Sequence, residues 1–89
     1  MEGVWVFQGA GSRFANGVFA SRAQAEDFIN LYRLTGILSW YPVGISAYDW
    51  AIQEHLFEPK KPEHYEVGFI QRFTTASQEH YHYDPDNVG

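Results

Sequence analysis

Apolar residues at the start of the chain alternate with the period of two that is typical of β-strands. Residues 4–8, Val-Trp-Val-Phe-Gln, carry apolar side chains on both faces, and residues 17–20 form a second short run. The glycine-containing segment 9–16 separates the two runs, which predicts an antiparallel hairpin. We expect Phe14 to pack this loop against the core.

The period changes to 3.6 at Ser21, which predicts the clearest helix of the chain. Ser21 is a favourable N-cap residue, and Gln24 three positions later completes a capping box. Helical spacing then places four apolar residues on one stripe: Ala25, Phe28, Ile29 and Tyr32. Gly36 favours a left-handed stop. The predicted helix therefore runs from Ser21 to Leu34 and packs its stripe across a sheet.

Shorter elements follow in the middle of the chain. Residues 37–43 predict a third strand, and Pro42 should lie at an edge or a bulge because it lacks an amide donor. Ser46, with Asp49 three positions on, caps a second helix that we predict from Ala47 to about His55.

The second predicted helix has an inward face and an outward face. Tyr48 and Ile52 lie one turn apart and should face inward. Trp50 is turned about 200° away from Tyr48, at 100° per residue. Trp50 should therefore be partly exposed, beside Glu54.

Three weaker segments complete the order of elements: a polar connection with two prolines at 58–63, a short helix at 69–73 and a last strand at 78–83. The order β-β-α-β-α-α-β and the length of 89 residues favour one α+β domain over residues 1–89. We expect a two-layer domain, with a three- to four-stranded, mainly antiparallel sheet and helices on one face. Residues 84–89 should form a flexible tail.

Composition narrows the class of protein. Hydrophobic residues make up 45% of the chain and charged residues 19%, which is a balance typical of folded proteins. The absence of cysteine excludes a disulfide scaffold and a thiol nucleophile. The net charge of −5 disfavours binding to a phosphate backbone, so no nucleic-acid partner is expected. No apolar run is long enough to span a bilayer and no targeting segment is recognisable, so we expect no membrane association and a cytoplasmic location.

Catalytic motifs are missing from the sequence. Gly9-x-Gly11 is followed by Phe14 where a third glycine would stand, and it leads into a strand instead of a helix. No serine lies in a nucleophile elbow, and no nucleophile and base are paired at a recognisable spacing. We therefore expect no enzymatic activity, no catalytic residues and no cofactor.

The His80-x-His82 pair is the strongest candidate for a metal site. On a strand, residues two apart share a face, so both imidazoles would point the same way, with Gln78 and Asp84. Two imidazoles and a carboxylate are suitable ligands for zinc or another divalent ion. No third ligand stands at a recognisable spacing, however, so the purified protein should carry no stoichiometric metal.

Aromatic residues make up 18% of the chain, which is more than so small a core can bury. Exposed Trp and Tyr side chains near acidic residues are typical of protein interfaces. The residues that we predict to bind a protein are Trp40, Tyr41, Trp50 and Tyr81, with Glu54 and Glu58 supplying negative charge.

Short segments along nearly the whole chain give it a family resemblance. They include 4–7, 34–36, 41–43, 48–51 and 78–83. With these segments the chain resembles a family of small, uncharacterised bacterial proteins built on a domain of unknown function. The resemblance supplies no catalytic residues. By analogy with other small stand-alone domains, it implies an immunity protein paired with a bacterial toxin.

Two functions remain open. The first is an acidic, non-enzymatic protein-binding module that neutralises a basic toxin domain. The second is a protein that binds a small ligand or a divalent metal on the His80/His82 strand.

Overall fold

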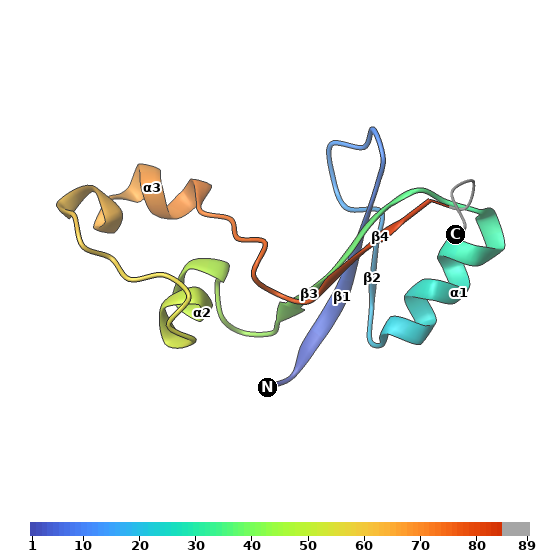
Figure 1. The fold of residues 1–89 in the computed structure, drawn as a ribbon, viewed down its shortest axis with the longest axis horizontal. Helices are drawn as coiled ribbons and strands as arrows, with labels where there is room; N and C mark the ends of the chain where they lie inside the picture. Colours follow the sequence, from blue (N-terminus) through green and yellow to red (C-terminus); the bar gives the residue numbers. More distant parts are fainter. Residues whose placement is uncertain (85–89) are drawn as a thin grey trace. The chain divides into compact units, whose positions relative to one another are not determined.

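The computed structural model describes residues 1–84, which gather into two compact units. Unit 1 comprises Met1–Val43 and the chain from Gln78 on, and unit 2 comprises Gly44–Ser77. Unit 1 contains β1 (Gly3–Gly9), β2 (Gly17–Phe19), α1 (Arg22–Tyr32), β3 (Gly36–Pro42) and β4 (His80–Tyr83). Unit 2 contains α2 (Ala47–Gln53), the 3₁₀ turn η1 (Pro62–Tyr65) and α3 (Val67–Arg72) (Figure 1).

The four strands form one open antiparallel sheet with the order β2-β1-β3-β4. β1 and β2 form the predicted hairpin, and the chain then crosses through α1 to place β3 on the other side of β1. The α+β class, the antiparallel sheet and the predicted order of elements are confirmed. One domain over 1–89 stays a prediction, and the predicted tail lies outside the described residues apart from Asp84.

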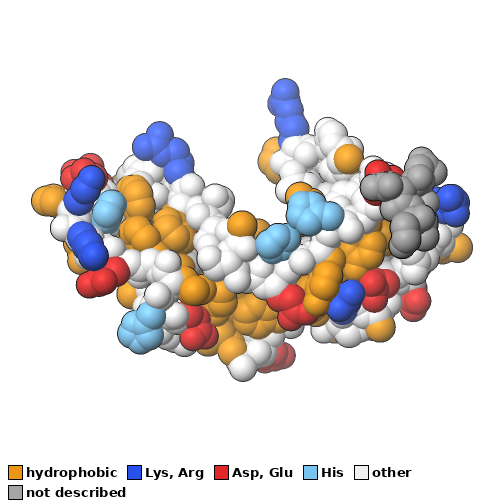
Figure 2. Space-filling model, in the orientation of Figure 1, with side chains coloured by type: hydrophobic (Ala, Val, Ile, Leu, Met, Phe, Trp, Pro, Cys, Tyr) orange, Lys and Arg blue, Asp and Glu red, His pale blue; other side chains and the backbone are white. Residues whose placement is uncertain are grey.

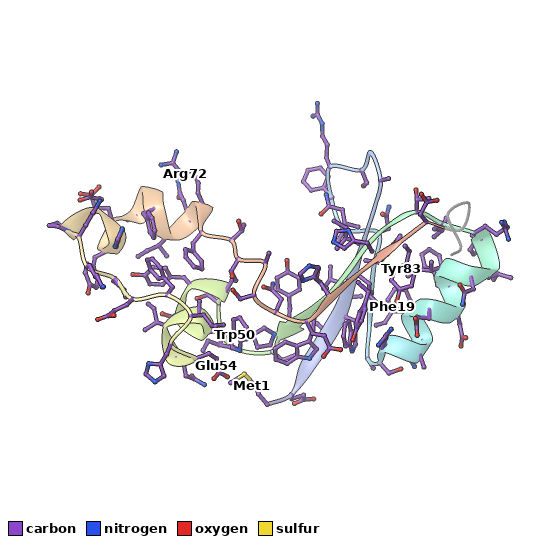
Figure 3. The ribbon with its side chains drawn as sticks, in the orientation of Figure 1. Met1, Phe19, Trp50, Glu54, Arg72 and Tyr83 are labelled. Atoms are coloured by element: carbon purple, nitrogen blue, oxygen red, sulfur yellow. The ribbon has the colours of Figure 1, made fainter. Side chains whose placement is uncertain are left out.

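The core of unit 1 lies between α1 and one face of the sheet. Four side chains in it are almost fully buried: Phe7, Ala25, Ile29 and Leu38. Burying a side chain as large as those of Phe7, Ile29 and Leu38 contributes roughly 1.5–3 kcal/mol. Phe19 and Tyr83 point from the sheet toward α1 and pack against this cluster (Figure 3).

The start of α1 is as predicted, but its end is not. The Ser21 side chain accepts the backbone N–H of Gln24 at 3.2 Å, and the Gln24 side chain accepts the N–H of Ala20 at 3.0 Å. The helix ends at Arg33, with a left-handed φ of 53°, and not at Gly36. The N–H of Leu34 bonds back to the Ile29 carbonyl at 2.9 Å, so the chain has already turned out of the helix.

The apolar stripe of α1 is also narrower than predicted. Ala25 and Ile29 are buried and Phe28 is partly buried, but Tyr32 is 63% exposed. Tyr32 lies in the last turn, where it meets the edge of the Phe28 ring at a centroid distance of 5.6 Å. The helix therefore buries about two turns of its apolar face.

The loop between β1 and β2 does not use Phe14 as an anchor. Phe14 is 79% exposed, so the prediction that it packs the loop onto the core is wrong. Polar bonds hold the loop instead. The Ser12 hydroxyl donates to the Phe14 carbonyl at 2.6 Å, and the Gln8 side chain donates to the Ser12 carbonyl at 2.9 Å. A loop closed by its own side chains does not need an aromatic contact to the core.

Candidate functional site

The two faces of the sheet differ in what covers them. Phe7 pairs with Leu38 and with Gly17, so these residues share the face on which α1 packs. Alternation puts the next residues on the opposite face. We call this opposite side the open face, because no helix described within unit 1 packs on it; its members are Val4, Val6, Gln8, Val18, Ile37, Ser39, Tyr41, His80 and His82.

The open face is apolar and uncharged within the paired strands. Val18, Ile37 and Tyr41 are exposed, with Val18 at 64%. Val6 lies between Val18 on one side and Ser39 on the other, so the apolar surface of this row covers β2 and β1 and gives way to polar side chains on β3 and β4. Among the described residues, the nearest charged positions along β1 and β4 lie just beyond the paired residues, at Glu2 and Asp84. In a chain of net charge −5, an uncharged apolar surface of this kind is typical of a contact surface.

Two histidines occupy the β4 side of the open face. The rings of His80 and His82 lie 5.4 Å apart between centroids, and both residues are exposed. Two histidine side chains adjoin over the sheet in Figure 2. Nδ1 of His80 lies 3.0 Å from the carbonyl oxygen of Gln78. A carbonyl oxygen can only accept a hydrogen bond. Nδ1 therefore carries the proton, and the lone pair of this imidazole is on Nε2.

The other face carries an aromatic and ionic cluster where α1 begins. The Arg22 guanidinium lies 3.5 Å above the centre of the Tyr81 ring, and the Trp5 ring lies 6.0 Å from that of Tyr81. Arg22 Nε is 3.5 Å from a carboxylate oxygen of Glu26, whose other oxygen accepts the Tyr83 hydroxyl at 2.8 Å. This cluster ties β4 to α1 through a cation–π contact and a charge-assisted hydrogen bond.

The tyrosines of this cluster are held in their neutral form. Burial raises the pKa of the Tyr83 hydroxyl, and its hydrogen bond to Glu26 raises it further. The pKa of Tyr81 is raised mainly by its hydrogen bond to the Glu79 carboxylate. Both groups donate a proton to an anion, so ionising them would place two negative charges together.

Unit 2 is built around an aromatic cluster of its own: Tyr48, Phe57, His64, Phe69 and Phe73. The Tyr48 hydroxyl donates to the His64 carbonyl at 2.7 Å. The His64 ring accepts the backbone N–H groups of Lys60 and Lys61 on Nδ1, at 3.1 and 3.3 Å. One histidine therefore joins the 58–61 segment to the aromatic core of unit 2.

A family model for a domain of unknown function, DUF7710, matches residues 4–88. The chain belongs to this family. No curated protein and no solved structure matches it. The match confirms the expected membership of a family without an assigned function, and it supplies no site residues.

The DUF7710 domain separates the residues that were predicted to form one binding surface. Trp40 is partly buried and Tyr41 is exposed, and they lie on opposite faces of β3. Tyr81 is partly buried beneath Arg22, on the same face as Trp40. Of these three residues, the open face contains Tyr41 alone.

Trp50 is the clearest error among the predicted binding residues. It is 7% exposed, and so is Tyr48, although the two side chains leave α2 in nearly opposite directions. The prediction assumed that α2 buries one stripe, but α2 buries residues on more than one side. Glu54 and Glu58 are exposed, and Glu54 directly follows the last residue of α2 (Figure 3 labels Trp50 and Glu54).

Other residues of the DUF7710 domain were not singled out from the sequence. Val18 and Ile37 fall within the predicted strands and Arg22 within the predicted helix, and the sequence assigned none of them a functional role. The available feature was the alternation of β1, which has apolar residues on both faces. Within unit 1, α1 packs on one of these two apolar faces and no described helix packs on the other.

Two further features, groups of three metal ligands and membrane-spanning helices, are absent from the described residues. Within the part of one chain that the structure describes, no three His, Asp or Glu side chains are grouped to hold a metal ion. Over residues 1–84, no helix is long and apolar enough to cross a membrane.

Proposed function

We propose that this DUF7710 protein is a non-enzymatic protein-binding module that docks through the open face of its sheet. The observation that supports the proposal is the combination of exposed Val18, Ile37 and Tyr41 with the absence of formal charge among the paired residues of that face. Burying an apolar surface of this kind against a partner lowers the free energy of the complex.

The proposed partner is a basic domain, most concretely a bacterial toxin that the protein neutralises. The net charge of −5 would steer a basic partner toward the chain, and the uncharged face would form the desolvated centre of the contact. Glu54 and Glu58 are exposed and contribute to the steering charge. Such a module acts by covering the partner's site, so it needs no catalytic residue of its own.

A matched pair of substitutions tests which surface binds. Val18→Lys places a charge on the open face, and Val67→Lys places the same charge on α3 at an even more exposed valine. Both variants have the same net charge, so they lose the same long-range attraction. A partner recovered by the wild type and by Val67→Lys, but not by Val18→Lys, would support the proposal.

The inhibitory role needs a second measurement. The partner recovered in this way should lose its activity when the purified wild-type chain is added, and regain it when Val18→Lys is used instead. Equal binding by both variants would contradict the assignment of the open face. A bound partner whose activity does not change would contradict the inhibitor.

A further inference from the structure

β4 is an outer strand of the sheet, and half of its backbone groups point away from it. The Glu79 carbonyl accepts the Trp40 N–H at 2.9 Å, and the registered pairs then place Tyr81 opposite Leu38 and Tyr83 opposite Gly36. In an antiparallel pair, bonded and non-bonded residues alternate. The N–H and C=O groups of His80 and His82 therefore point outward from the edge.

Although β4 is short, it lacks the lysine and proline that commonly prevent a further strand from pairing. Residues 80–83, His-Tyr-His-Tyr, contain no lysine, no proline and no glycine. Acidic residues stand only at its two ends, as Glu79 and Asp84. The favoured register of a further strand is therefore one in which no acidic residue lies opposite Glu79 or Asp84.

We propose that β4 pairs antiparallel with β4 of a second copy, and that the two copies together bind one zinc ion with His80 and His82 from each. Opposite residues in an antiparallel pair point to the same face. A metal site shared by the two copies therefore requires the histidines of one copy to lie opposite those of the other. The register centred on Tyr81 places His80 opposite the second copy's His82, and the reverse. In this register Glu79 faces Tyr83 and Gln78 faces Asp84, so no acid faces an acid.

The geometry of four histidines in this register suits a tetrahedral metal. Side chains lie about 6.6 Å apart along a strand and about 5.5 Å apart across the pair. Within one chain the two imidazole rings are already 5.4 Å apart between centroids. Imidazoles reaching inward from the corners of such a rectangle can bring four nitrogens to the 2.0–2.1 Å that zinc requires.

The hydrogen bond of His80 supports the same assignment. Histidines that bind a metal usually donate their other ring N–H to a carbonyl or carboxylate, which fixes the tautomer and the orientation of the ring. The His80 Nδ1–H donates to the Gln78 carbonyl at 3.0 Å, leaving Nε2 as the ligand. Over residues 1–84 a single chain groups two ligands, below the three that a stable site needs, which is why one chain alone is not expected to hold a metal; a second copy completes the set.

The proposal is tested on the full chain without a polyhistidine tag, after removal of metal with a chelator. Sedimentation velocity should show a monomer, and addition of zinc chloride should double the sedimenting mass. Titration calorimetry should give half a zinc ion per chain. Either His80→Ala or His82→Ala should abolish the zinc-dependent dimer, and His55→Asn should leave it unchanged. His55 is the matched exposed histidine of unit 2, and asparagine suits its left-handed φ of 59°.

A crosslink tests the register independently of the ligands. The chain has no cysteine, and Tyr81 would lie opposite its own copy at about 4.5 Å between Cα atoms, a distance that a disulfide can bridge. Mild oxidation of Tyr81→Cys should give a disulfide-linked dimer, faster with zinc present. Val18→Cys, at the other edge of the sheet, should show no such acceleration.

Three results would overturn the proposal. Zinc bound by a chain that stays monomeric would remove the second copy. A dimer that forms equally well after chelation would remove the metal. Circular dichroism verifies that the histidine variants are folded, and folded variants that still dimerise with zinc would remove these ligands.

Discussion

At the scale of single residues, the tyrosines and one histidine carry the most specific chemistry. Tyr81 and Tyr83 donate to Glu79 and Glu26, so their neutral forms are favoured. His64 uses a ring nitrogen as an acceptor inside an aromatic cluster. The roles of the two tyrosines can be tested by titration, and the role of His64 can be tested by substitution.

The tyrosines predict a loss of stability in alkali. The pKa values of Tyr48, Tyr81 and Tyr83 are raised above the ordinary value of about 10 in the folded chain. Above pH 10 the unfolded chain releases protons that the folded chain retains, so the free energy of unfolding falls as the pH rises. Below pH 10 this contribution is fully present.

Urea unfolding between pH 8 and pH 11.5 should show that decline. Absorbance at 295 nm should show these phenols ionising later in the folded chain than in the denatured one. Tyr83→Phe should make the pH dependence less steep. A midpoint that is constant or rises over this range would contradict the prediction.

His64 contributes both a ring and an acceptor to unit 2, and two variants separate them. His64→Phe keeps the ring contacts with Phe57 and Phe69 but leaves the N–H groups of Lys60 and Lys61 without their acceptor. His64→Asn keeps an acceptor but loses the ring. Each should lower the free energy of unfolding by about 1 kcal/mol, measured by urea denaturation. A His64→Phe variant as stable as the wild type would show that the acceptor contributes nothing.

At the scale of elements, α1 holds the sheet through a small number of aromatic contacts. The Phe28 ring meets Phe7 edge-on at 6.3 Å and Phe19 at 5.6 Å, although Phe28 itself is partly exposed. We expect Phe28→Ala to lower the free energy of unfolding by about 3 kcal/mol, the low end for a buried phenylalanine. Tyr32→Ala, one turn further on, should lower the free energy of unfolding clearly less. Thermal melts of both variants measure the difference. Equal losses would show that both rings belong to the core.

In α2, Trp50 is expected to affect folding and not recognition. Because Trp50 is buried, Trp50→Ala removes buried volume and should lower the free energy of unfolding by about 3–5 kcal/mol. The chain has three tryptophans, so a change in tryptophan fluorescence cannot be assigned to one of them. Amide hydrogen exchange of α2 and α3 is therefore the better measurement. Unchanged protection there would restore Trp50 as a surface residue.

The sequence predicted what local chemistry decides. Ser21 and Ser46 both cap helices as expected, because capping depends on neighbours three positions away. The prediction that His80 and His82 share one face was also correct, because residues two apart on a strand always point to the same side. Trp50 was misplaced because its burial depends on tertiary packing around α2, which helical periodicity alone does not contain. The left-handed C-cap expected at Gly36 lies at Arg33, and Gly36 is already the first residue of β3.

At the scale of the whole molecule, charge and apolar surface occupy different residues. Eleven acidic and six basic residues give the net charge of −5, yet the paired strands of the open face carry none of them. In the proposed complex, charge would govern the rate of encounter and the open face would govern the lifetime.

Glu54 tests the first half of that division. Glu54→Lys should slow association with a basic partner and make its rate less dependent on salt, while dissociation changes little. Glu54→Gln should fall between this variant and the wild type. Surface plasmon resonance at two salt concentrations measures both rates. An unchanged association rate would exclude Glu54 from the steering charge.

The insertion of unit 2 between β3 and β4 also bears on the order in which the chain folds. β4 can reach β3 only when the ends of residues 44–77 come together, and closing a flexible loop costs more entropy as it lengthens, about 0.6 kcal/mol per doubling. If unit 2 collapses first, that long loop becomes a short one before β4 arrives. A substitution that loosens unit 2 would then delay the docking of β4, which would be the last strand of the sheet to gain protection during refolding.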